Sequence, residues 1–178
     1  MKNTGGPIVT INTSSARVLI LFDNANLLSS LQNLRIQLNF SKTLRYIKKR
    51  FGKVVFAKCY MDKDEFESPG KKSLISLLKR LGVTIYKKQP KHVTIGGITI
   101  MRCDVDAVIV ADMFDRMDDY DILIIFSGDK DYVYAIQLLQ NKGKHVVAVS
   151  ISEDASESLI QTCDEYIDLR EIANEIML

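Results

Sequence analysis

The sequence predicts a three-layer α/β/α fold with a mainly parallel central sheet. Two observations predict it: short apolar runs alternate with amphipathic stretches, and glycine or acidic residues close most of those runs. Such alternation favours a parallel sheet with helices on both faces. With 178 residues, 47% of them hydrophobic, the chain fits one domain with a substantial core.

Five apolar runs are predicted strands, at residues 17–22, 53–60, 83–86, 121–126 and 145–150. Asp23 follows the first strand and Asp129 follows the fourth. We expect these two acids to meet, because ligands bind outside the carboxyl ends of parallel strands where strand order reverses. Strand one should therefore lie beside strand four, which predicts the order 3-2-1-4-5. Residues 166–167 are expected to add a short strand.

The stretches between the strands have helical spacing. Leu44 and Ile47 lie three apart in the predicted helix 42–51, for which Ser41 is the expected N-cap. A second helix carries leucines at 74, 77, 78 and 81 and ends at Gly82. Further helices are expected at residues 106–117, 132–141, 155–162 and 169–177.

One segment departs from this alternation and predicts an inserted β-hairpin at residues 93–100. Two runs that alternate Thr with Val or Ile flank the pair Gly96-Gly97, which is typical of a two-residue turn. Basic residues surround it, among them Lys88, Lys91 and Arg102. A flexible basic hairpin at the rim of an acidic pocket suits a phosphate-backbone substrate, so we expect these three residues to contact its phosphates.

Residues 1–16 are rich in Asn, Thr, Ser and Gly, and lack the basic start and long apolar core of a signal peptide. We expect a flexible lead-in followed by one domain, residues 17–178. No apolar run approaches the ~18 residues of a membrane span. The three cysteines form no zinc pattern, and Cys59 follows a strand-like run, which favours a reduced core thiol. We therefore expect a cytoplasmic protein without membrane contact; a homodimer is left open.

Three aspartates are candidates for a catalytic metal site. Asp23 and Asp129 follow predicted strands, and Asp106 opens the helix that leads into the fourth strand. Clustered carboxylates repel one another, and a divalent cation compensates for that repulsion. Oxygen-only ligands suit Mg²⁺ or Mn²⁺ better than zinc. The alternative for Asp23 is a helix N-cap, which is common after a strand.

Other polar residues have supporting roles in this hypothesis. Asn24 and Asn26 offer amides that orient a metal-bound water or Asp23, with turn formation as the alternative. Asp131 is either a ligand or the cap of the helix at 132. Asp112 lies six residues after Asp106, on another helix face, and is peripheral. Tyr132 either stacks on a base or packs in the core.

These residues resemble the NYN domain family of the PIN-like ribonuclease superfamily, in its LabA-like branch. The resemblance rests on Asp23-Asn24-Ala25-Asn26, on Arg102-Cys103-Asp104-Val105-Asp106 with Asp112, and on Ser127-Gly128-Asp129-Lys130-Asp131-Tyr132. It implies a PIN-like, Rossmann-like fold and metal-dependent RNA cleavage, with Asp23, Asp106 and Asp129 as the catalytic and metal-binding core. With RNA as the implied substrate, in single-stranded form, we expect Lys88, Lys91, Arg102 and Lys130 to bind it. Lys130 replaces the small residue usual between the two aspartates, where it reaches the phosphate or partly neutralises the site.

Rival functions fit less well. A phosphatase of the haloacid dehalogenase type requires Asp-x-Asp after strand one, and Ala25 occupies the second position. The serious alternative to a nuclease is a catalytically weak RNA-binding or assembly module on the same fold. Metal-dependent turnover of RNA distinguishes the two.

Overall fold

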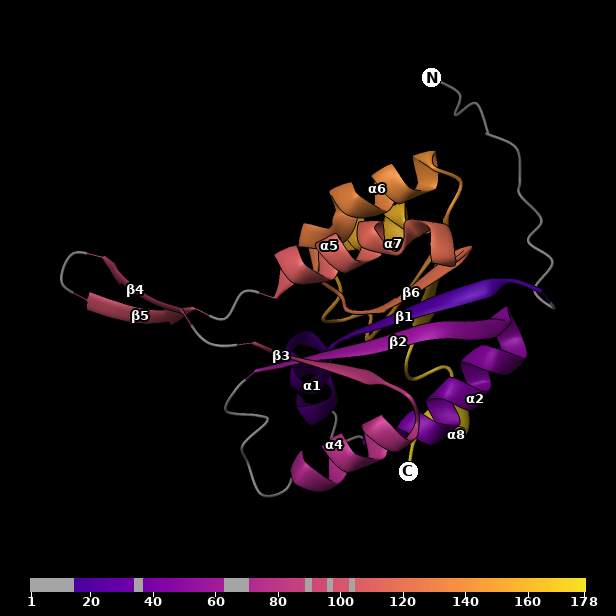
Figure 1. Ribbon diagram of the computed structural model, residues 1–178, viewed down its shortest axis with the longest axis horizontal. Helices are drawn as coiled ribbons and strands as arrows, with labels where there is room; N and C mark the ends of the chain where they lie inside the picture. The colour runs from indigo at the N-terminus through magenta and orange to yellow at the C-terminus, as the bar shows by residue number, and fades with distance from the viewer. Residues whose placement is uncertain (1–14, 34–36, 63–70, 89–90, 96–97, 103–104) are drawn as a thin grey trace.

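The computed structural model of the protein describes residues 15–33, 37–62, 71–88, 91–95, 98–102 and 105–178. Its centre is a six-stranded sheet of order β3-β2-β1-β6-β7-β8, in which every neighbouring pair is parallel (Figure 1). The predicted order 3-2-1-4-5 is confirmed, and the short strand near 166 extends it at one edge. The strands are β1 Arg17–Asp23, β2 Lys53–Asp62, β3 Thr84–Lys88, β6 Ile122–Phe126, β7 His145–Ser150 and β8 Glu165–Asp168.

Helices cover both faces of this sheet, so the three predicted layers are confirmed (Figure 1). One layer contains α1 Asn24–Asn33, α2 Phe40–Phe51, α4 Lys71–Arg80 and α8 Ala173–Ile176. The other contains α5 Asp106–Asp115, α6 Val133–Asn141 and α7 Glu157–Thr162, with the short 3₁₀ turns η1 Met117–Asp119 and η2 Lys130–Tyr132.

The central strands are apolar on both faces because both faces are covered. In β1, Val18, Ile20 and Phe22 pack into one core, while Leu19 and Leu21 pack into the other. All five side chains are 0% exposed. Burial of each such side chain contributes roughly 1.5–3 kcal/mol, which explains why β1 reads as a continuous apolar run.

The inserted hairpin is present as β4 Lys91–Ile95 and β5 Ile98–Arg102. These strands pair antiparallel with Val93 opposite Ile100, as predicted, and form a sheet of their own. The hairpin follows the carboxyl end of β3 and precedes α5, and Figure 1 shows it projecting from that edge of the body. The predicted turn at residues 96–97 lies outside the described residues.

Some helix boundaries differ from the predicted ones. Helix α1 was not predicted, because only Leu27 and Leu31 are buried hydrophobic residues among its many polar ones. The last helix was predicted at 169–177 but spans only Ala173–Ile176. The chain before it is held instead by Leu169, whose N–H donates to the Ser150 carbonyl at 2.8 Å, so turns replace the first part of that helix.

The N-cap of α2 was also predicted wrongly. Asn39, not Ser41, precedes the helix in an extended conformation, and its side-chain oxygen accepts from the Lys42 N–H at 3.1 Å. Ser41 lies inside the first turn. Both residue types cap helices well, so the sequence pattern did not distinguish them.

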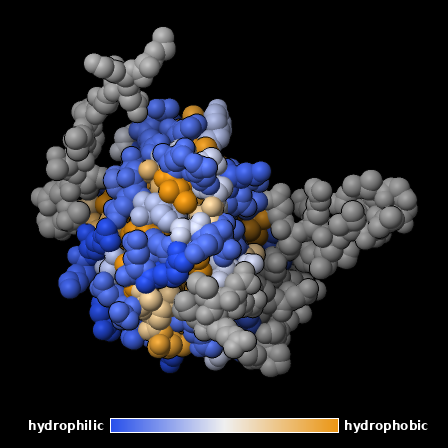
Figure 2. Space-filling view, turned by 180° about the vertical axis from the view of Figure 1, so that it is seen from behind, coloured by the Kyte–Doolittle hydropathy of each residue, from blue (hydrophilic) through white to orange (hydrophobic). Residues whose placement is uncertain are grey.

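The remaining fold-level expectations concern thiols, the surface and the lead-in. Cys59 is a buried thiol that forms no disulfide, as predicted. The face seen in Figure 2 is mostly hydrophilic, with hydrophobic residues in small separate patches. Within the described ranges, no helix has the length and apolar character needed to cross a membrane. Of the lead-in, residues 1–14 lie outside the described part of the chain.

The capping assignment yields a stability prediction. Asn39→Ala should lower the free energy of unfolding by about 1 kcal/mol, because the Lys42 N–H loses its side-chain acceptor. The matched control Ser41→Ala should change it by less than about 0.5 kcal/mol. Urea unfolding of both variants measures the difference. A larger loss of unfolding free energy for Ser41→Ala than for Asn39→Ala would identify Ser41 as the cap.

Candidate active site

Three segments far apart in the sequence meet at the carboxyl edge of the sheet. β1 and β6 pair in parallel with Phe22 opposite Phe126, so Asp23 at the end of β1 lies beside Ser127 after β6. Helix α5 begins at the same edge with Asp106. The predicted adjacency of the first and fourth strands is therefore confirmed, and it is what assembles this site.

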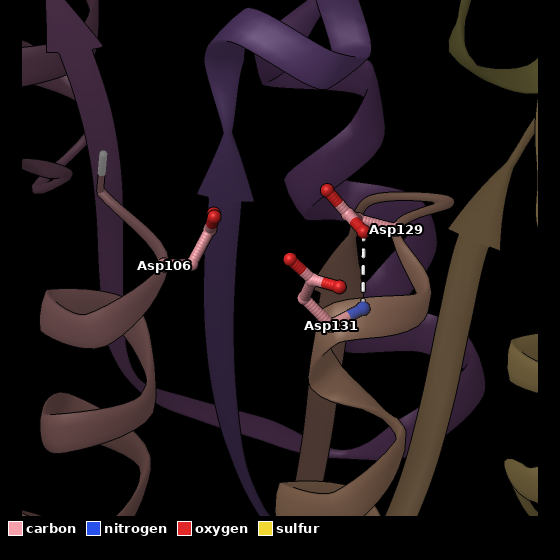
Figure 3. Close-up of side chains that lie close together, drawn as sticks. All are labelled: Asp106, Asp129 and Asp131. Atoms are coloured by element: carbon pink, nitrogen blue, oxygen red, sulfur yellow. Dashed lines mark hydrogen bonds between the residues drawn. The ribbon is translucent and has the colours of Figure 1, made fainter. Parts of the chain in front are cut away.

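Three carboxylates converge there. Asp106, Asp129 and Asp131 each offer an oxygen, and these oxygens lie within 4.8 Å of one another. Figure 3 shows Asp106 extending from the start of α5 toward the two aspartates of the loop that follows β6. Asp106 and Asp129 are half-buried, whereas Asp131 is exposed to solvent. The cluster is therefore open on one side.

The loop after β6 is shaped by its own hydrogen bonds. Asp129 is the N-cap of η2, since its Oδ1 accepts from the Asp131 N–H at 3.0 Å (Figure 3). Helix α6 then begins with Tyr132 at its N-cap position and without a side-chain cap. The cap considered for Asp131 is therefore not made, because α6 has no side-chain cap, and the carboxylate of Asp131 joins the acidic cluster.

Gly128 fixes the position of this loop. Its N–H donates to the Asn26 side-chain oxygen at 2.9 Å, and its carbonyl accepts from the Ser156 N–H at 2.9 Å. A Cβ at this position would lie 2.8 Å from the Cα of Ala155, closer than real contacts allow. Only glycine fits, and Asn26 holds the loop to the start of α1. Asn24 is buried at the first position of that helix.

Asp23 lies behind the cluster and not within it. It is 3% exposed and accepts three hydrogen bonds, from the Ser127 hydroxyl at 3.0 Å, the Tyr132 hydroxyl at 3.2 Å and the Asn26 N–H at 3.3 Å. The Tyr132 hydroxyl also lies 2.8 Å from Asp106 Oδ1, so its single proton is shared between the carboxylates of Asp23 and Asp106. One hydroxyl group therefore connects Asp23 to the acidic cluster.

Tyr132 is a functional residue whose role the sequence did not reveal. Its ring is 0% exposed, so the alternative that it stacks on a base is wrong. Burial raises the pKa of its hydroxyl, and the nearby charges of Asp23 and Asp106 raise it further. The group therefore stays protonated at neutral pH and remains a hydrogen-bond donor to the carboxylates.

Burial also raises the pKa of the Asp23 carboxyl above its ordinary value. Hydrogen bonds from the Asn26 N–H and the Ser127 hydroxyl oppose this shift, and the charge of Asp106 adds to it. Since desolvation is the largest cause, the folded protein favours the protonated form of Asp23 more than the unfolded chain does.

Asp112 belongs to a different contact. Its carboxylate accepts from the Lys58 ammonium and the Tyr60 hydroxyl, both on β2. Asp112 therefore joins α5 to the sheet at a distance from the start of that helix. This agrees with the helical spacing, which places Asp112 on another face from Asp106.

The basic residues predicted to bind RNA differ in accessibility. Lys88 ends β3 and is only 8% exposed. Lys91 and Arg102 pair across the base of the hairpin, at the end nearest α5; their side chains lie outside the described residues. Lys130 begins η2 between the two aspartates of the loop and is exposed.

Comparison with known proteins identifies a protein family that this chain matches. A family model described as the NYN domain matches residues 17–170. The chain is 36% identical over 102 residues to the Low amplitude and bright protein LabA of Synechococcus elongatus, covering 56% of this chain and 55% of that protein. It thus spans about half the length of that curated relative.

A solved structure supports the fold. The crystal structure of a Vibrio parahaemolyticus protein of unknown function has a TM-score of 0.76 to this chain at 22% sequence identity. The alignment covers 92% of this chain and 97% of that one. At this identity the likeness concerns the three-layer α/β architecture alone.

The raised pKa of Asp23 predicts a pH dependence of stability. Its stabilising contribution is complete below the ordinary aspartate pKa and is lost as pH rises through the raised one. Asp23→Asn is neutral throughout, so its melting temperature should gain relative to the parent as pH rises from about 4 to about 7. Thermal melts in EDTA measure this trend. If the difference in melting temperature between Asp23→Asn and the parent stays constant or shrinks as pH rises, the prediction is wrong.

Proposed function

The chain belongs to the NYN domain family, and on this premise we propose that it is a metal-dependent ribonuclease that cleaves RNA phosphodiester bonds. The observation that carries the proposal is the convergence of Asp106, Asp129 and Asp131 at the carboxyl edge of the sheet. Carboxylates gathered on one open edge repel one another unless something positive joins them. The resemblance to NYN nucleases supports the same conclusion.

The donor set fits a hard divalent cation. Among the residues that the structure describes, the cluster consists of three carboxylates, and such oxygen ligands suit Mg²⁺ or Mn²⁺. We propose that Asp106, Asp129 and Asp131 hold it. When bound, such a cation supplies a water of lowered pKa and positive charge for the phosphate.

The protein's own residues orient these ligands. The Tyr132 hydroxyl donates to Asp106 and fixes the direction of that carboxylate. Asp23 holds Tyr132 in turn, so we propose that Asp23 acts as a positioning residue and not as a direct ligand. Ser127 links Asp23 to the loop after β6, because its hydroxyl donates to Asp23 and accepts from the Asp129 N–H at 3.2 Å. Loss of such supporting contacts typically costs about 10- to 100-fold in metal affinity or activity.

Basic residues near the cluster supply phosphate contacts in this proposal. Lys130 lies in the loop that carries Asp129 and Asp131. Lys91 and Arg102 lie at the base of the hairpin, a short distance along the chain from Asp106. We propose single-stranded RNA as the substrate. Lys88 is the weakest of the four candidates because little of it is exposed.

Two observations favour a second function, an RNA-binding or assembly module with little turnover. Asp23 is covered and fully engaged by three donors, and Lys130 brings a positive charge into the acidic loop. Both features weaken a catalytic cluster. Metal-dependent cleavage decides between the two functions. A cytoplasmic location and a homodimer remain predictions.

The activity prediction uses isosteric changes in the cluster. Asp129→Asn and Asp106→Asn should each lower cleavage of a labelled single-stranded RNA in Mg²⁺ or Mn²⁺ by about 100-fold or more, because each removes a metal ligand. EDTA should abolish cleavage by the parent protein. Asn still caps helices, so Asp129→Asn should melt near the parent, whereas Asp129→Ala should melt lower.

Asp115→Asn is the matched control, since it removes an exposed carboxylate at the other end of α5. It should leave cleavage unchanged. If the parent binds RNA but does not cleave it in either metal, the binding module replaces the nuclease. If Asp129→Asn melts far below the parent and still cleaves, Asp129 is only a cap.

The hairpin gives a binding prediction. The double change Lys91→Ala and Arg102→Ala should weaken RNA binding and reduce the slope of log affinity against log salt by about 2, one for each lost phosphate contact. Fluorescence anisotropy in EDTA measures binding without cleavage.

A double change of Lys48 and Lys49 to Ala is the control for this experiment. Lys48 and Lys49 are exposed on α2, which lies in the helix layer on the other side of the sheet from α5. Their replacement removes two positive charges, as the hairpin variant does. It should leave the salt slope nearly intact. If the hairpin variant matches the parent in affinity and slope, RNA does not pass the hairpin.

A further inference from the structure

Tyr134 is an aromatic residue in an unusual place. It is 71% exposed, and among the residues that the structure describes it is the only large aromatic side chain classed as exposed. It belongs to the first turn of α6, directly after the loop that carries the acidic cluster. A single exposed hydrophobic side chain is ordinary on a protein surface, so what distinguishes Tyr134 is its place beside the candidate active site.

The geometry of α6 directs this ring toward the cluster. Ala135, Ile136 and Leu139 are the buried face of the helix, and Tyr134 lies on the solvent side. Side chains on a helix lean toward its N-terminus and cover the preceding turn. For Tyr134 that turn is η2, which contains Lys130 and Asp131.

Spacing makes Tyr134 a surface neighbour of both residues. It follows Asp131 by three positions and Lys130 by four. On helical backbone such pairs have Cβ atoms roughly 5–6 Å apart. An aromatic face, an ammonium group and a member of the acidic cluster therefore share one small area.

The surroundings favour a nucleobase over a protein partner. Lys130, Asp131 and Gln137, which lie three or four positions from Tyr134 along the chain, are all exposed and polar. A protein interface has an apolar core of several residues, which this isolated ring does not provide. A single ring beside a cation instead matches proteins that bind single-stranded nucleic acid, where a base stacks on the aromatic face and a cation contacts the backbone.

We propose that Tyr134 and Lys130 form a subsite for one unpaired nucleobase and its phosphate, adjacent to the acidic cluster. This rests on the proposed function, and it names the part of the substrate that the site recognises. Every base has a stacking face, so the subsite tolerates any sequence. A base inside a duplex has both faces covered by its neighbours, so the subsite selects single strands.

The test is a double-mutant cycle between protein and RNA. Anisotropy in EDTA compares a short single-stranded RNA with a set of oligonucleotides that carry one abasic position each. For the parent, one abasic position should weaken binding about 5- to 150-fold. Tyr134→Ala should weaken binding of the intact RNA by a similar factor. An abasic site at the sensitive position should then weaken binding to this variant no further.

Matched variants distinguish the loss of ring stacking from a loss of folding and from a loss of apolar surface. Tyr134→Phe keeps the ring and should bind as the parent does, whereas Tyr134→Leu should behave like Ala. The chain contains no tryptophan, so Tyr134→Trp introduces a single tryptophan whose emission should change when RNA stacks on it. Truncation of a side chain this exposed should leave the melting temperature unchanged.

The outcomes are distinct. If the parent binds and cleaves RNA while Tyr134→Ala binds equally well and the abasic scan is flat, the subsite is overturned and the proposed function stands. If Tyr134→Ala alters only the oligomeric state, the ring is a protein contact and the subsite is overturned. If the parent binds no RNA, both are overturned.

Discussion

Parallel pairing of β1 with β6 is the interaction on which the remaining geometry depends. Both strands are buried on both faces, so their register is fixed by two cores at once. That register sets Asp23 beside the Ser127 hydroxyl, although the two residues lie 104 positions apart. A slip by one residue would turn every side chain of β1 to the wrong core and separate the two halves of the site.

The loop after β6, which carries Asp129 and Asp131, is also held by contacts with the segment that follows β7. Gly128 contacts the segment at residues 151–156, through the Ser156 N–H and the close approach of Ala155. That segment is joined to the end of β8, where the Asp168 carboxylate accepts from the Ser152 N–H and from the Arg170 guanidinium. These hydrogen bonds hold the pKa of Asp168 well below its usual range. The site thus rests on contacts that extend to the far edge of the sheet.

The sequence was sufficient for the features that follow from burial, and insufficient for those that follow from local geometry. Continuous apolar runs predicted the central strands, and the expectation that Asp23 and Asp129 meet predicted their order. Helix α1 was missed because its two buried leucines stand among polar residues. Asn39 and Ser41 are both good caps, so a shift of two positions left the pattern unchanged. Asp131 is as good a cap by type, but α6 has no side-chain cap. Tyr132 was read as core or base contact because its carboxylate partners lie 109 and 26 positions away.

The hairpin has a consequence for how this fold can diversify. Strands β4 and β5 pair with each other in a separate sheet, while the six parallel strands pair among themselves. The entropic cost of a longer connection rises slowly with its length. The segment between β3 and α5 can therefore lengthen, shorten or exchange side chains without disturbing the register that assembles the acidic edge. Evolution can alter the rim of the site in this one module while the interior stays constant.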